Sequence, residues 1–157
     1  MFFMVILLFS NCATYSNTIL LHTYIENVSN DSFKILLKTK DGCSETGFHF
    51  KGDYFDETSY GEEKPFVAST LDELNILKDK YFYLPYLDEF SEDYFEKYYL
   101  VFIIHHFTGG DILKNERIEK IDGEIVFAIE NWREPNISLG MIPKCVFSAL
   151  YILQISK

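Results

Sequence analysis

The chain has 157 residues, and its 24 acidic residues outnumber its 14 lysines and arginines, so the formal net charge is −10. Such an acidic chain repels phosphate groups, which argues against nucleic acid as a partner and against an electrostatic hold on anionic lipid. Because 48% of the residues are hydrophobic and 17% are aromatic, the composition excludes a disordered chain and predicts one folded domain.

The first segment, residues 1–9 (MFFMVILLF), is almost wholly apolar. At about 1.5 Å per helical residue it is too short to cross a hydrocarbon core of ~30 Å, but it has the length of the apolar core of a signal peptide. The stretch that ends it, LFSNC at residues 8–12, resembles the relaxed bacterial lipobox of spirochaete lipoproteins. We therefore expect a lipoprotein-type signal peptide over residues 1–11 and lipidation of Cys12. A Sec-type signal and a buried first strand are the alternatives.

This expectation also bears on the domain boundaries and on the two other cysteines. Residues 12–24 are interpreted as a tether or a first strand, and residues 25–157 as a single globular domain. If Cys12 carries lipid, Cys43 and Cys145 remain as the even pair that one disulfide in an oxidising compartment would need. Two unrelated buried thiols are the alternative, because cysteine is commonly buried.

Strands are predicted in the first part of the chain from apolar and β-branched runs. Residues 32–40 (SFKILLKTK) form the first clear strand. Residues 43–61 are polar and contain several glycines, so they are interpreted as a loop or a loose hairpin around FHFKGDYF. Residues 64–68 form a short strand, which Pro65 places at a sheet edge or at a strand start.

Two helices are predicted next. The sequence TLDE at residues 70–73 is a capping box, in which the Thr70 hydroxyl accepts the Glu73 N–H and the Glu73 side chain reaches back. The apolar run YFYLPYL at residues 81–87 leaves this helix because Pro85 interrupts it. Ser91 is expected to cap a second, short helix in SEDYFEKY.

The rest of the chain predicts long strands. Residues 99–107 (YLVFIIHHF) are nearly continuous in apolar character and should be central and buried on both faces. Asp122-Gly123 predicts a tight hairpin between RIEKI and EIVFAIENW, and residues 146–155 predict a final strand. One capped helix, one short helix and about six strands define an α+β fold with an antiparallel sheet or sandwich.

The order of elements over residues 91–157 resembles the PrcB-like family, which is named from a lipoprotein subunit of a spirochaete surface protease complex. The family pattern is an apolar strand, a Thr-Gly-Gly-Tyr turn, an alternating hairpin with a DG-type turn and a final strand. Thr108, Gly109 and Gly110 match the turn, and Asp111 stands in place of the tyrosine. The resemblance implies an accessory or interaction module rather than a catalyst. We take the turn from Thr108 to Asp111 as the candidate interaction site.

The residues that could bind a metal or act in catalysis each also have a purely structural interpretation. His105 and His106 are adjacent near the end of a strand, so their side chains should point to opposite faces and cannot easily share one metal. Either one, with an acidic partner, would serve a metal site or a general base; one buried and one exposed histidine is the alternative. The acidic cluster of Asp88, Glu89, Glu92 and Asp93 could bind calcium but lacks the ligand spacing of a calcium loop, so it is interpreted as a solvated helix start. Asp53, Asp56 and Glu57 are interpreted in a similar way.

The aromatic-rich run of residues 81–99 is either a partner-binding or glycan-binding surface, or core packing beneath the helix. We expect a non-enzymatic exported lipoprotein that binds another envelope protein, such as a protease complex, and that meets the membrane only through its N-terminal lipid. No catalytic residue, metal site or cofactor is predicted. The alternatives are a small envelope metal-binding protein or hydrolase that uses His105 or His106, and an intracellular globular protein.

Overall fold

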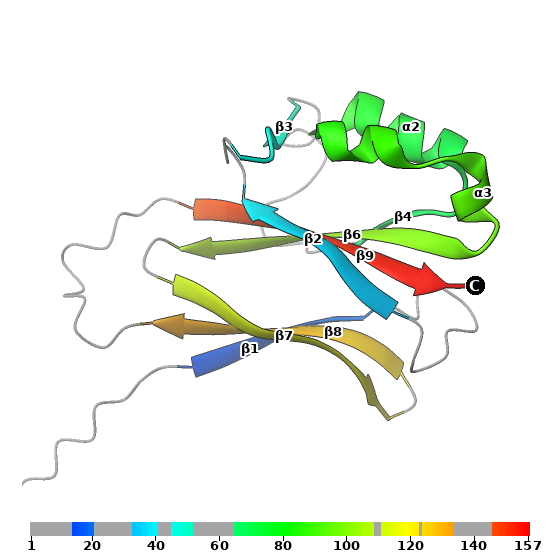
Figure 1. Ribbon diagram of the computed structural model, residues 1–157. Helices are drawn as coiled ribbons and strands as arrows, with labels where there is room; N and C mark the ends of the chain where they lie inside the picture. Colours follow the sequence, from blue (N-terminus) through cyan, green and yellow to red (C-terminus); the bar gives the residue numbers. More distant parts are fainter. Residues whose placement is uncertain are drawn as a thin grey trace, which may run out of the picture.

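The computed structural model describes residues 14–20, 33–40, 45–51, 65–108, 111–122, 124–133 and 146–157. In this part of the chain two antiparallel sheets pack face to face, and helices cover the outer face of one of them (Figure 1). The predicted α+β fold with an antiparallel sheet or sandwich is confirmed.

Every strand pair is antiparallel. The three-stranded sheet has the order β1 (Thr14–Leu20), β8 (Glu124–Arg133), β7 (Asp111–Ile121). The four-stranded sheet has the order β2 (Phe33–Lys40), β9 (Val146–Ser156), β6 (Tyr98–Thr108), β4 (Phe66–Ala68). A small ribbon joins β3 (His49–Phe50) to β5 (Phe82–Tyr83). The helices are α2 (Leu71–Lys80), the 3-10 helix η1 (Pro85–Glu89) and α3 (Glu92–Phe95).

The central strands β6 and β9 are buried on both faces, as their apolar sequences predict. Alternate side chains along each strand point to opposite sides of the sheet, so these two strands feed two hydrophobic clusters. On the helical side lie Leu100, Phe102, Ile104, Leu150 and Ile152, and on the side of the three-stranded sheet lie Val101, Ile103, Ala149, Tyr151 and Leu153. Residues 64–68 yield β4, whose place at the sheet edge agrees with the prediction from Pro65.

The cap of α2 follows the predicted capping box. Thr70 is extended and its hydroxyl accepts the Glu73 N–H at 3.1 Å. The Glu73 carboxylate accepts from both the backbone N–H and the hydroxyl of Ser69, each at 2.7 Å. The Glu73 side chain therefore reaches back as predicted, to the Thr70 backbone, and it gains two further donors from Ser69.

The second predicted helix differs in detail from the prediction. Ser91 precedes α3, but its side chain makes no capping hydrogen bond, and its backbone carbonyl accepts the Tyr94 N–H at 3.1 Å. The helix is a single turn, shorter than SEDYFEKY. His49–Phe50 pairs with Phe82–Tyr83, a pairing that the sequence did not predict; residues 52–61 of the predicted loop or loose hairpin lie outside the described residues.

The hairpin of β7 and β8 forms as predicted, and its first arm contains a bulge. Asp122 has a φ of 52°, as the tight turn requires. The register shifts between Lys114 and Arg117, and Asn115 has a φ of 53° within the bulge. Asn tolerates this left-handed conformation better than most residues. The bulge explains why residues 112–121 alternate only loosely in sequence.

Residues 14–20 form the strand β1, which pairs with β8 from Thr14 opposite Trp132 to Leu20 opposite Val126. Of the two interpretations of residues 12–24, a tether or a first strand, the structure has the strand over these seven residues. The folded domain therefore begins no later than Thr14, which corrects the predicted start at residue 25. The segment 1–13 lies outside the described residues.

Replacing Glu73 by glutamine should destabilise the fold in a pH-dependent way. Hydrogen bonds from the Ser69 side chain and backbone lower the pKa of Glu73 below its ordinary value of 4.5. The carboxylate therefore contributes stability above pH 4.5, and this contribution is lost as the pH falls through the folded-state pKa. We expect Glu73→Gln to lower the free energy of unfolding by about 0.5–1 kcal/mol at pH 7 and by less at pH 3, as measured by thermal melting. Asp79→Asn, in the last turn, is the control and should not lower the melting temperature; an equal loss at both pH values in Glu73→Gln would contradict this account.

Candidate functional site

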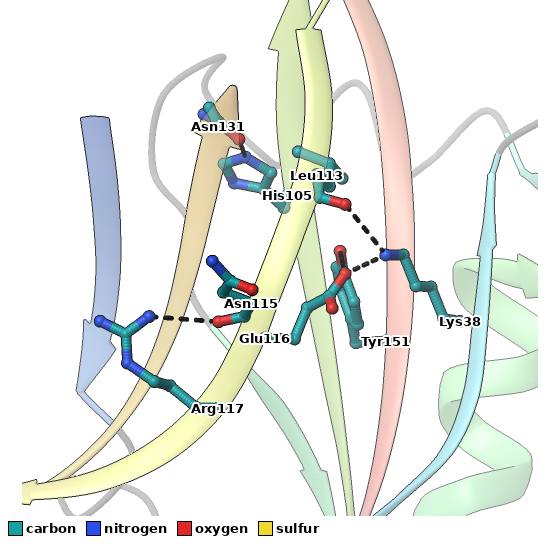
Figure 2. Close-up of polar contacts among 8 residues, drawn as sticks. All are labelled: Lys38, His105, Leu113, Asn115, Glu116, Arg117, Asn131 and Tyr151. Atoms are coloured by element: carbon teal, nitrogen blue, oxygen red, sulfur yellow. Dashed lines mark hydrogen bonds and ion pairs between the residues drawn. The ribbon is translucent and has the colours of Figure 1, made fainter. Parts of the chain in front are cut away.

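Three polar side chains meet between the two sheets: Lys38 of β2, Glu116 of β7 and Tyr151 of β9 (Figure 2). The Tyr151 hydroxyl donates to Glu116 Oε1 at 3.2 Å, and Lys38 Nζ forms an ion pair with the same oxygen. Lys38 Nζ also lies 3.5 Å from the Leu113 carbonyl oxygen and 5.6 Å from the centre of the Tyr151 ring. We call Lys38, Glu116 and Tyr151 the intersheet cluster.

The charge state of the intersheet cluster follows from burial and from its hydrogen bonds. Burial by itself raises the pKa of Glu116, but the hydrogen bonds and the charge of Lys38, with the Tyr151 hydroxyl, outweigh it and leave the pKa lowered. Burial raises the pKa of Tyr151, and the nearby Glu116 carboxylate raises it further. At neutral pH the cluster is thus an anion held by a lysine and a neutral tyrosine, which suits a structural link between sheets better than proton transfer.

The two adjacent histidines point to opposite faces of β6, as predicted. His105 is completely buried, and its Nε2–H donates to Asn131 Oδ1 of β8 at 3.1 Å (Figure 2). His106 Nδ1 and Ser148 Oγ share a hydrogen bond of 2.8 Å between directly opposed residues of β6 and β9. That distance is within reach for a base and a nucleophile, but only 9% of Ser148 is exposed. The contact is better described as a cross-strand pair.

The described acidic residues of the first candidate cluster lie on the surface. Asp88, Glu89, Glu92 and Asp93 are exposed, and Asp88 forms an ion pair with Lys78 of α2. In the part of the chain that the structure describes, no three His, Cys, Asp or Glu side chains are arranged to hold a metal ion. Asp53, Asp56 and Glu57 of the other cluster lie outside that part.

Most of the aromatic run at residues 81–99 packs into the core rather than forming a partner surface. Phe82 and Phe95 are buried in the cluster beneath the helices, and Tyr86, Phe90 and Tyr94 pack against it in edge-on pairs. Tyr83 is the exception: it is 51% exposed and stacks on His49 with ring centres 4.7 Å apart. Core packing is therefore the interpretation that fits most of this run.

One end of the sandwich gathers the start of β1, the end of β8 and the start of β7 (Figure 1, left). In register, Thr14 lies opposite Trp132, and Trp132 lies opposite Ile112. The end of β6 and the start of β9 lie at the same end, where Thr108 pairs with Val146. We call this the N-terminal end of the sandwich.

The predicted interaction turn connects the two sheets at this N-terminal end. Thr108 is the last residue of β6 in the four-stranded sheet, and Asp111 is the first residue of β7 in the three-stranded sheet. Gly109 and Gly110 between them lie outside the described residues. Cys12, Cys43 and Cys145 also lie outside, so lipidation and the disulfide stay predictions.

In the described segments, no helix has both the length and the apolar character needed to cross a membrane. Comparisons of the chain with protein-family models, with curated proteins and with solved structures find no match. The resemblance to the PrcB-like family therefore stays a prediction.

Sequence reasoning missed the intersheet cluster and the side chains at the N-terminal end. Glu116 belongs to the acidic and basic run KNERIEK, in which every charged residue could equally face solvent. The weak alternation around Asn115 was the one signal of the bulge that turns Glu116 inward.

Removing the Glu116 carboxylate should lower the free energy of unfolding more than removing the Tyr151 hydroxyl does. Glu116→Ala leaves the buried Tyr151 hydroxyl without this acceptor and should cost roughly 1–3 kcal/mol, whereas Tyr151→Phe should cost roughly 0.5–1.5 kcal/mol because Lys38 still pairs with Glu116. Urea unfolding of both variants and of the double variant measures this. The double variant should lose less than the sum of the single losses; strict additivity would contradict the link. Glu119→Ala, whose carboxylate pairs with Arg117, is the matched control.

Proposed function

We propose that this chain is a non-enzymatic, lipid-anchored interaction module of the bacterial envelope. The apolar run at residues 1–9 and the lipobox-like stretch ending at Cys12 support the anchor. The observation that carries the proposal further is the position of β1, which begins at Thr14. Only Ala13 would separate a lipidated Cys12 from the sandwich, so the anchor would hold the domain directly at the membrane rather than on a long tether.

The short distance along the chain between the anchor and the sandwich limits where a binding partner could lie. The turn from Thr108 to Asp111 lies at the N-terminal end, where β1 begins. A partner that uses this turn would itself have to lie at the membrane surface. A subunit of a membrane-associated protease complex, which the resemblance to the PrcB-like family implies, would meet that condition.

The polar groups of the interior support a binding role over catalysis. His105 is fully buried against Asn131, and Glu116 is bound by Lys38 and Tyr151. Each of these groups links one sheet to the other, and a general acid or base would instead need to reach a substrate.

Replacing Cys12 by serine should release the protein from the membrane, because the sulfur of Cys12 is the atom that would form the thioether bond to diacylglycerol. We expect the wild-type chain, made in a bacterium that processes lipoproteins, to enter the detergent phase of a Triton X-114 partition and Cys12→Ser to remain in the aqueous phase. Cys43→Ser is the matched control and should behave as the wild type does. If Cys12→Ser partitions with the wild type, the anchor proposal is wrong.

A further inference from the structure

We infer that the N-terminal end of the sandwich rests on the phospholipid bilayer, with Ile112, Phe147 and Trp132 at the boundary between lipid and water. This inference deepens the proposed lipid anchor and rests on it for the orientation of the domain. It replaces the expectation that lipid at Cys12 is the chain's only contact with the membrane.

The first observation is exposed apolar surface at this end. Ile112 is 43% exposed and Phe147 is 44% exposed, although both are large hydrophobic residues. Phe147 lies opposite Phe107 on the neighbouring strand, and their rings stack with centres 5.9 Å apart. Burying such side chains in an apolar layer is favourable in proportion to the area removed from water.

The second observation is the kind of polar residue that surrounds them. Trp132 is half-buried, and Lys114 Nζ lies 4.2 Å from the centre of its ring. Lys40 Nζ lies 5.2 Å from the Phe107 ring. Tryptophan is enriched where headgroups meet acyl chains, and lysine amines near that level can reach lipid phosphates.

The charge at this end fits a phosphate-bearing surface better than the net charge of −10 does. Glu130 lies two positions before Trp132 on β8. Its carboxylate accepts hydrogen bonds from Arg117 Nη1 at 2.9 Å and from Asn115 Nδ2 at 2.7 Å. Lys114 lies directly opposite Glu130 in the register. Because Glu130 binds Arg117 and Asn115, the Lys114 ammonium lies over the Trp132 ring instead. Among the described side chains, Lys40 and Lys114 thus lie beside the aromatic rings of this end, while the molecule as a whole is acidic.

The third observation is the place where the chain enters the sandwich, at the start of β1. This place favours a bilayer over other binding partners for this end. Thr14, Trp132 and Ile112 lie in one row across β1, β8 and β7. The segment that precedes Thr14 contains the apolar run and Cys12. A lipid attached there would bring the membrane to the same end of the sandwich that carries the exposed apolar side chains.

Trp132 is the only tryptophan of the chain, so its fluorescence reports on this end without a label. The lipidated full-length protein would be reconstituted into phosphatidylcholine–phosphatidylglycerol vesicles that contain lipid brominated near the headgroup end of the acyl chains. We expect strong quenching of Trp132. The double variant Ile112→Ser/Phe147→Ser should lose most of this quenching. Ile76→Ser, which removes a 62% exposed side chain on α2, is the matched control and should quench as the wild type does.

The outcomes separate this inference from the anchor. A lipidated, vesicle-bound protein whose Trp132 is not quenched would overturn the docking while the anchor stands. Quenching of the unlipidated Cys12→Ser chain that still depends on Ile112 and Phe147 would support docking by this end and show that it does not need the anchor. Absence of lipid quenching together with a blue shift of Trp132 emission at rising protein concentration would assign this end to a second copy and overturn the inference.

Discussion

The fold depends on one constraint: β6 and β9 are apolar on both faces and must be covered on both. Val101 and Phe102, side by side in β6, are completely buried on opposite sides of the sheet. The helices cover one side and the three-stranded sheet covers the other (Figure 1). Because burial of apolar surface is the dominant favourable term in folding, neither layer can be removed without exposing a row of large side chains. The N-terminal end is created by this stacking, since the sheets meet there through the link from Thr108 to Asp111.

Polar contacts then fix how the two sheets sit on each other. A buried polar group without a partner is costly, so each intersheet hydrogen bond favours one alignment over others that bury similar area. His105 with Asn131 joins β6 to β8, and Glu116 with Tyr151 joins β7 to β9 (Figure 2). These contacts tie each sheet to the other. The proposed contact with the membrane needs that rigidity, because side chains from both sheets take part in it.

Features encoded by local sequence were predictable, and features that depend on distant pairing were not. The continuous apolar run at residues 99–107, the cap at Thr70 and the turn at Asp122 each have a local physical signature. The pairing of β3 with β5 joins two residues to two others far along the chain, which local periodicity does not specify. The inward turn of Glu116 depends on a bulge that weak alternation alone did not reveal. At the N-terminal end, Trp132 was visible in sequence, but its position opposite Thr14 follows only from the sheet order.

An anchored domain with a partly apolar N-terminal end and an acidic net charge would lie on a membrane in one orientation. Its helical layer would lie along the side of the domain, on the outer face of the four-stranded sheet. The turn from Thr108 to Asp111 would be available only to partners at the same surface. The anchor is the central claim, and intact-mass spectrometry of the protein purified in detergent from its own cells tests it most directly. The account predicts a chain that begins at Cys12 and carries the added mass of diacylglycerol. A mass that retains Met1 and includes no lipid would contradict it.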